Sequence, residues 1–117
     1  LVQVLINLIS NGRDACRDTE NPRVIVRTRF VSGFVVNAIR FGKPTRLPIQ
    51  IRVSDNGPGI PPALRDHIFE PFITSNTSGT GLGLAITKRI VTAHKGNIFV
   101  ESYPGGTMFH ILLPKAE

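Results

Sequence analysis

The sequence predicts a single α/β domain, in which long helical segments alternate with short strands. Residues 1–19 repeat apolar side chains with helical spacing, and residues 82–95 do the same. Residues 23–31 and 48–54 instead alternate apolar and polar side chains, which is typical of strands. The chain has 117 residues, of which 41% are hydrophobic, and this is enough for one hydrophobic core but not for two domains.

The composition excludes several classes of protein. The sequence holds no apolar run near the roughly 18 residues of a membrane span, so we expect no membrane contact. Its single cysteine, Cys16, cannot form an internal disulfide and suits a reducing cytoplasm, and we expect it in the core. The net charge of +6 permits nucleic-acid binding, but the basic residues are scattered and the sequence has no tryptophan. We therefore expect a positive surface that faces ATP or an acidic partner, without direct nucleic-acid contact.

A polar stripe runs along the first predicted helix. Its members recur every three or four residues and so share one face: Gln3, Asn7, Asn11, Asp14 and Asp18. Asn is a poor helix former, and two amides one turn apart suit a hard cation such as Mg²⁺. On spacing alone, a solvated face is an equal alternative. Because the chain opens inside this helical pattern, we expect it to be a fragment of a longer protein.

A carboxylate follows the strand predicted at residues 48–54. Asp55 precedes Asn56-Gly57-Pro58-Gly59, so the strand ends in a tight glycine turn. A carboxylate only accepts hydrogen bonds and the exocyclic amine of adenine donates them, which suits Asp55 to reading the base. A plain Asp-Asn-Gly turn is the alternative. Before this strand, residues 32–47 predict either a long loop or an extra hairpin.

Alternating glycines precede the second long helix, in the stretch Gly79-Thr80-Gly81-Leu82-Gly83-Leu84. Such glycines let backbone N–H groups approach a ligand closely, and the helix behind them adds its positive dipole end. This predicts a phosphate cradle, with a flexible loop as the alternative. The spacing fits neither the P-loop nor the Rossmann fingerprint.

The second long helix and the segment before it complete the pattern. We expect Gly96 to end the helix in the left-handed conformation and His94 to cap its last turn. Residues 61–67 begin with two prolines and predict a short helix. The second long helix, at residues 82–95, is expected to bury Leu82, Ala85, Ile86, Ile90 and Ala93.

Two further features precede and follow the second long helix in the sequence. Phe69 and Phe72 should anchor a loop to the core, ahead of a polar stretch at residues 73–78. Residues 97–102 and 107–113 predict a terminal hairpin.

The order of these features resembles the ATP-binding catalytic domain of sensor histidine kinases, in the wider family of Hsp90, DNA gyrase B and MutL. The resemblance covers essentially residues 1–117. Residues 7–11 look like the N box, 55–59 the first glycine box, 69–72 the F box and 79–84 the second glycine box. The resemblance implies the Bergerat ATP-binding fold, an α/β two-layer sandwich with a mixed, mostly antiparallel sheet backed by helices and ATP on the helical side.

The resemblance also implies roles for the matching residues. Asn11 would hold Mg²⁺ and, with Asn7, would form the catalytic positions. Asp55 would bind the adenine amine, and Thr107 would lie near the base through water. The full set of implied nucleotide ligands is Asn11, Asp14, Asp55, Gly57, Gly59, Ile60, Phe72, Thr74, Ser75, Gly79, Thr80, Gly81, Leu82, Gly83, Leu84 and Thr107.

Position 7 separates branches of the family. Relatives that hydrolyse ATP typically carry a glutamate there, whereas this chain has Asn7, and a carboxamide is not a useful general base. The resemblance therefore implies phosphoryl transfer to a histidine on a separate dimerisation domain, with a response-regulator receiver domain downstream. An ATPase clamp or chaperone module and a serine kinase that sequesters a sigma factor are the alternatives.

The lid region is similar to that of nitrogen-regulation sensor kinases of the NtrB type, and residues 32–47 are similar to the alphaproteobacterial branch. Three positions depart from the common family pattern. Asn76 stands where a lysine is common, which would leave more phosphate charge to backbone amides. Gly12 replaces a common alanine and predicts either the close approach of a backbone or ligand, or simple tolerance of glycine in the helix. Lys95 replaces a common glycine.

Overall fold

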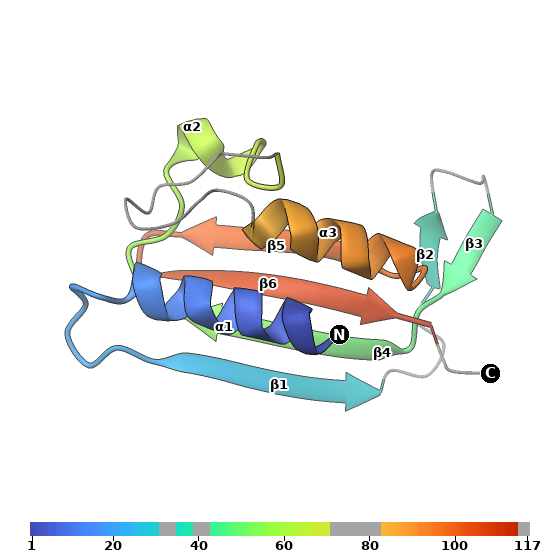
Figure 1. The fold of residues 1–117 in the computed structure, drawn as a ribbon, viewed down its shortest axis with the longest axis horizontal. Helices are drawn as coiled ribbons and strands as arrows, with labels where there is room; N and C mark the ends of the chain where they lie inside the picture. Colours follow the sequence, from blue (N-terminus) through green and yellow to red (C-terminus); the bar gives the residue numbers. More distant parts are fainter. Residues whose placement is uncertain (31–34, 39–42, 71–82, 115–117) are drawn as a thin grey trace.

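The computed structural model describes residues 1–30, 35–38, 43–70 and 83–114. The elements follow the order α1 (Val2–Ala15), β1 (Val24–Phe30), β2 (Val35–Ala38), β3 (Lys43–Arg46), β4 (Ile49–Asp55), α2 (Pro62–Arg65), α3 (Gly83–Ala93), β5 (Asn97–Tyr103) and β6 (Gly106–Leu113). The longer helices α1 and α3 lie side by side on one face of a sheet (Figure 1). This two-layer arrangement confirms the predicted α/β sandwich.

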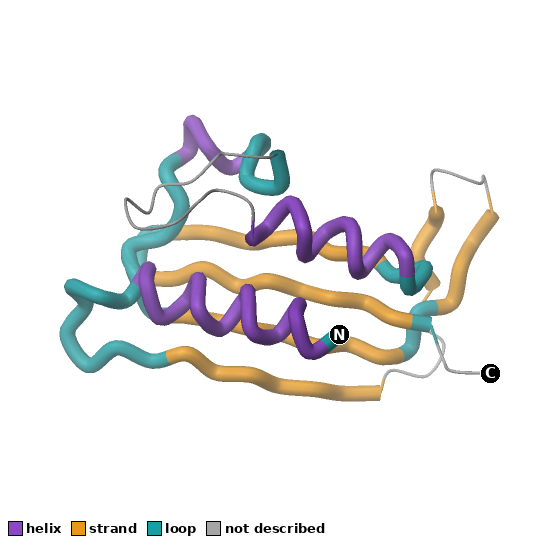
Figure 2. The backbone as a smooth tube through the Cα atoms, in the orientation of Figure 1, coloured by secondary structure: helices purple, strands orange, loops and turns teal. Residues whose placement is uncertain are grey.

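The main sheet has the strand order β1-β4-β6-β5, and every pair in it is antiparallel. Asp55, the last residue of the central strand β4, pairs with Val24 of β1 on one side and with Thr107 of β6 on the other. Strands β2 and β3 form a separate antiparallel pair beside one end of the main sheet (Figure 2). Of the two alternatives for residues 32–47, the hairpin is therefore correct, although its turn lies outside the described residues.

The core fills the space between the helices and the sheet. It consists of Val4, Leu8, Val53, Ile68, Val91, Ile98, Phe109, Ile111 and Leu113. Burying a side chain of this size contributes roughly 1.5–3 kcal/mol. Phe69 packs edge-on against Phe109, with ring centroids 6.4 Å apart, and so confirms that it anchors its segment to the core. Phe72 lies outside the described residues.

The buried face of α3 differs from the predicted one. Thr87 and Val91 are buried, whereas Ile86 is 41% exposed and Ala93 is exposed. Leu84, Thr87 and Val91 recur at intervals of three and four residues, which is the spacing of one helical face. The prediction was wrong for Ile86 and Ala93 because it followed hydrophobicity, whereas the sheet is covered by a face that includes a buried hydroxyl. Ile90 does pack against the core, and Leu82 lies outside the described residues.

The end of α3 corrects a second expectation. The left-handed residue is Lys95, with φ 61°, and Gly96 N–H then donates to Val91 O at 2.9 Å. Gly96 is needed for a different reason: a Cβ there would stand 2.5 Å from the carbonyl oxygen of Leu112. His94 caps the helix as predicted, since its Nδ1 lies 2.9 Å from Ile90 O.

The first helix is shorter than predicted and ends at Ala15. Cys16 follows it and is buried, as expected, at 1% exposure. No helix within the described ranges is both long and apolar enough to cross a membrane.

Candidate functional site

Asp55 is the last residue of β4 and lies opposite Thr107 of β6. Its side chain is buried, and its Oδ1 accepts a hydrogen bond from Gly57 N–H at 2.9 Å. Burial raises the pKa of this carboxyl above 3.8, and the Gly57 hydrogen bond opposes the rise. Among the described residues this is the only hydrogen bond of the carboxylate, so acceptor capacity remains for a ligand's donor.

Two glycines after Asp55 allow the turn that follows β4 to approach other segments of the backbone closely. A Cβ on Gly57 would stand 2.7 Å from Ala15 O, which is too close for any side chain. Gly59 has φ +90°, and a Cβ on it would stand 2.4 Å from Tyr103 O. The turn after β4 is therefore held against the end of α1 and the tip of the β5–β6 hairpin.

A hydroxyl pair joins this turn to the hairpin. Ser102 and Thr107 face each other across β5 and β6, and their hydroxyl oxygens lie 3.1 Å apart. Ser102 Oγ also accepts a hydrogen bond from Ile60 N–H at 2.6 Å. We call Asp55, Gly57, Gly59, Ser102 and Thr107 the sheet end of the site.

The other part of the site lies between α1 and α3. Asn7 Nδ2 donates to Gly83 O at 3.2 Å and to Thr87 Oγ1 at 3.3 Å. Gln3 Nε2 donates to Asn7 Oδ1 at 2.8 Å. Asn11 follows one turn later on the same stripe of α1 and is half-buried. We call Asn7, Asn11, Gly83 and Thr87 the helix end of the site.

Gly12 lies on α1 where the helix meets both β1 and Asp55. A Cβ on Gly12 would stand 3.1 Å from Val24 Cγ2 and 3.5 Å from Asp55 Cβ. The close neighbours of Gly12 are therefore side chains, and not the backbone or ligand whose close approach was one of the two alternatives for this glycine. At this point α1 lies directly against Asp55, the residue that ends β4.

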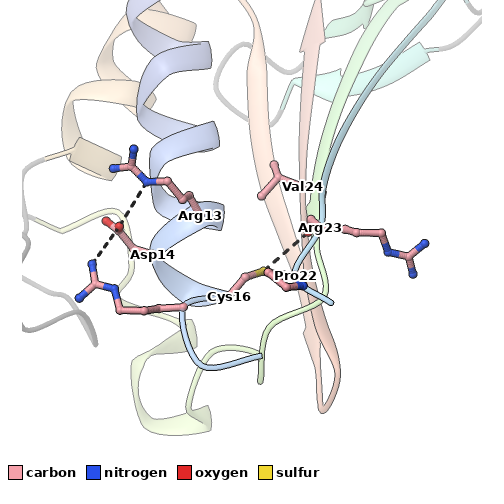
Figure 3. A pocket seen from close by; sticks show the side chains of 7 residues that line it. Arg13, Asp14, Cys16, Pro22, Arg23 and Val24 are labelled. Atoms are coloured by element: carbon pink, nitrogen blue, oxygen red, sulfur yellow. Dashed lines mark hydrogen bonds and ion pairs between the residues drawn. The ribbon is translucent and has the colours of Figure 1, made fainter. Parts of the chain in front are cut away.

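Asp14 continues the α1 stripe and pairs with two arginines. Its Oδ1 lies 3.7 Å from Arg13 Nε and 3.3 Å from Arg17 Nη2. Figure 3 shows the side chains of Asp14 and Arg13 near each other, while the Arg23 side chain points away from them. The three residues line a cavity of about 440 Å³ with Cys16, Pro22, Arg23 and Val24. The positive charges of Arg13 and Arg17 therefore balance the negative charge of Asp14.

The site offers few charged ligands for a metal ion. The part of the chain that the structure describes contains no group of three or more His, Cys, Asp or Glu residues that could hold one. Mg²⁺ accepts few protein ligands and keeps several water or phosphate oxygens. The neutral amide of Asn11 fits that donor set, whereas a cation that needs a full protein cage would not fit.

Comparison with known proteins identifies the family. Residues 1–117 match the family described as histidine kinase-, DNA gyrase B-, and HSP90-like ATPase. The chain belongs to this family. It is 38% identical over 117 residues to the sensory histidine kinase/phosphatase NtrB of Rhizobium meliloti, covering 100% of this chain and 31% of that protein.

Two further matches agree. The chain is 43% identical over 120 residues to NtrB of Rhodobacter capsulatus, covering 99% of this chain and 32% of that protein. It matches the structure of the mycobacterial sensor histidine kinase MprB with a TM-score of 0.74 and 30% identity, covering 96% of this chain and 70% of that one. The chain thus spans about a third of the length of these NtrB relatives. As a member of this ATPase family, it carries a nucleotide-binding domain.

The structure groups some of the predicted site residues and is silent on others. Asp55, Gly57, Gly59, Ile60 and Thr107 lie together at the sheet end. Gly83 and Leu84 form the start of α3, and the Gly83 carbonyl accepts a hydrogen bond from Asn7 of α1. Asn11 and Asp14 lie on α1. The other predicted ligands fall outside the described residues: Phe72, Thr74, Ser75, Gly79, Thr80, Gly81 and Leu82. Asn76 also falls outside them.

Sequence reasoning missed three residues of this neighbourhood. Ser102 is recognisable only once the hairpin register pairs it with Thr107. Thr87 had no motif to mark it. Asn56 had no role of its own in the predicted glycine turn, yet its Oδ1 accepts from Arg23 N–H at 2.7 Å and its Nδ2 donates to Asn21 O at 2.9 Å. Asn56 thereby ties the turn after β4 to the start of β1.

Proposed function

We propose that the chain binds Mg-ATP on the helix-covered side of its sheet and donates the γ-phosphate to a histidine on another domain of the same protein. Asp55 carries the proposal. It is a buried carboxylate at the end of a central strand, with one described hydrogen bond, to Gly57 N–H. The exocyclic amine of adenine would donate to its free acceptor sites.

The helix end would hold the charged part of the ligand. Asn11 would contribute one oxygen to Mg²⁺, whose other ligands would be phosphate and water oxygens. The start of α3, at Gly83, would direct backbone N–H groups and a helix dipole at the phosphates. The domain would thus act by positioning ATP and stabilising charge, because the attacking nucleophile comes from elsewhere.

Asn7 supports transfer rather than hydrolysis. Its amide nitrogen already donates to Gly83 O and Thr87 Oγ1, and its amide oxygen already accepts from Gln3 Nε2. A carboxamide so engaged does not take a proton from water.

The chain's own histidines are poorly suited to accept the phosphate. His110 is buried and stacked on Phe99, with ring centroids 4.5 Å apart, and burial lowers the pKa of its imidazole. His94 bonds a carbonyl of α3, and His67 pairs with Glu70. These contacts support an acceptor histidine on a dimerisation domain of the same protein. Similarity to NtrB supports nitrogen-responsive two-component signalling, a response regulator as the next partner and a cytoplasmic location.

Radiolabelled ATP tests the proposal directly. The 117-residue chain should bind ATP without acquiring label, and label should appear when the rest of the natural protein is added. That phosphate should be acid-labile and base-stable, as expected of a phosphohistidine. If the isolated chain labels itself, the division of labour is wrong.

The alternatives give different products. Steady release of inorganic phosphate by the chain alone would favour an ATPase clamp. Acid-stable phosphate on a partner serine would favour a serine kinase.

A further inference from the structure

Thr87 forms a bridge between the two long helices. It is fully buried, at 0% exposure, one turn into α3. Its Oγ1 donates to Gly83 O at 2.8 Å and accepts from Asn7 Nδ2 at 3.3 Å. The first of these bonds is a common habit of threonine in helices. The second is not local, because Asn7 belongs to α1.

The carbonyl of Gly83 accepts hydrogen bonds from the side chains of both Thr87 and Asn7. Gly83 O accepts from Thr87 Oγ1 and, at 3.2 Å, from Asn7 Nδ2. Gln3 completes the chain of bonds by donating to Asn7 Oδ1. Asn7 is thus held from both sides, and its position is coupled to that of the first peptide of α3.

This bridge lies between the two parts of the helix end. Gly83 is the first residue of α3, and a Cβ on it would have Asn7 Cγ as its nearest described neighbour, at 4.0 Å. Asn11 stands one turn beyond Asn7, about 6 Å along the axis of α1. A hydrogen bond that fixes Asn7 against Gly83 therefore also fixes the spacing between Asn11 and the start of α3.

We propose that Thr87 is a positioning residue that sets the separation between the metal-holding Asn11 and the phosphate-holding start of α3. It acts through Asn7 and the carbonyl of Gly83 and does not touch the nucleotide. The inference rests on the proposed function, because it assumes that Mg²⁺ and phosphate bind at these two places.

Packing alone does not account for a hydroxyl at this position. Burying a hydroxyl costs free energy unless it is hydrogen-bonded, and a valine of similar shape would fill the same space. One turn further on, the buried residue of α3 is indeed Val91. A valine could not form this bridge. The Thr87 hydroxyl accepts from the amide of Asn7 on α1 and donates to the carbonyl of Gly83 on α3.

The experiment compares ATP affinity with and without Mg²⁺ in the natural full-length protein. In Thr87→Val, the factor by which Mg²⁺ strengthens ATP binding should fall roughly 2–10-fold, the range expected for one lost buried hydrogen bond. Thr87→Ser should restore the factor, because serine keeps the hydroxyl. Thr92→Val, at a half-buried threonine of the same helix, is the matched control and should leave it unchanged.

Two results would overturn the inference. One is an equal loss of affinity with and without Mg²⁺. The other is a lower melting temperature with no change in the Mg²⁺ factor. If Thr87→Val does not fold, Asn7→Ala carries the same test, and an unchanged factor in that variant would equally reject the bridge. Failure of the unmodified protein to bind ATP would instead reject the proposed function.

Discussion

The sheet end and the helix end of the site are held by different kinds of interaction. At the sheet end, backbone segments approach so closely that a single added methyl on Gly57 or Gly59 would collide with a carbonyl oxygen. At the helix end, Gly83 has no described atom nearer than 4.0 Å to an added Cβ, and side-chain amides and a hydroxyl span the gap between helices. The sheet end therefore combines close backbone contacts with hydrogen bonds of Gly57, Ile60 and Ser102, whereas at the helix end side-chain hydrogen bonds make the link.

This difference has a consequence for function. Overpacking a crowded backbone costs more than removing one hydrogen bond, so the sheet end should resist change as a rigid unit. The end that would hold phosphate and metal depends on the relative placement of two helices. Substitutions should therefore affect stability most at the sheet end and metal-dependent binding most at the helix end.

Gly59→Ala should have the largest effect. It combines a positive φ with a Cβ 2.4 Å from Tyr103 O, and should lower the free energy of unfolding by about 2–5 kcal/mol. Gly105→Ala is the matched control, because Gly105 has φ +103° but no atom within 4 Å of an added Cβ. It should lose only about 1–2 kcal/mol by urea denaturation. Equal losses would show that crowding is not what holds this end.

Asp55→Asn should weaken adenine nucleotide binding by about 1–3 kcal/mol, since an amide presents a donor to a donor. The asparagine Oδ1 can still accept from Gly57 N–H, so the turn should persist. Calorimetry with ADP measures the loss, and the exposed Asp66→Asn should leave the affinity unchanged. An unaltered affinity in Asp55→Asn would remove Asp55 from the base site.

Asn11→Ala should act on the helix end alone. The strengthening of ATP binding by Mg²⁺ should fall on the order of tenfold, which is about 1.4 kcal/mol, while binding without Mg²⁺ stays unchanged. Asn97→Ala, an exposed residue at the start of β5, serves as the control. If binding without the metal falls equally, Asn11 contacts the nucleotide itself.

The smallest predicted effect is a pH dependence at the sheet end. Burial raises the pKa of Asp55 above its unfolded value of 3.8, so the folded state binds the proton more tightly. The resulting stability is fully present below pH 3.8 and is lost as the pH rises through the folded pKa. Urea denaturation across this window should show a fall with rising pH in the unmodified protein that is absent in Asp55→Asn. A parallel pH profile in the two proteins would contradict the assignment.

Much of the fold was predictable because local patterns agreed with it. The strand at Ile49–Asp55 and the terminal hairpin alternate as sheet positions must, and the order of motifs indicated the family. The helix faces were less predictable. Hydrophobicity favoured Ile86 as an inward residue of α3, but the sheet is covered by the face that carries Thr87.

The glycines show the same division. The sequence marked Gly57 and Gly59 as turn residues, and both are needed there. It also marked Gly96 as the left-handed residue that ends α3, but Lys95 has the positive φ and Gly96 instead makes room for Leu112 O. A sequence can show that a glycine is present, but which neighbouring atom requires it depends on segments that meet only in the folded chain.

The sequence by itself determined the family, the α/β class and the residue types that could read a base or hold a metal. These follow from motif order and local periodicity, which a linear chain contains in full. Only the tertiary structure decided that Asn7 bonds Gly83 and Thr87, or that Ser102 joins Thr107 to the turn after β4. Asn7 and Thr87 are 80 residues apart, and no local rule specifies a hydrogen bond over that distance. Packing two helices on one sheet face brings them together.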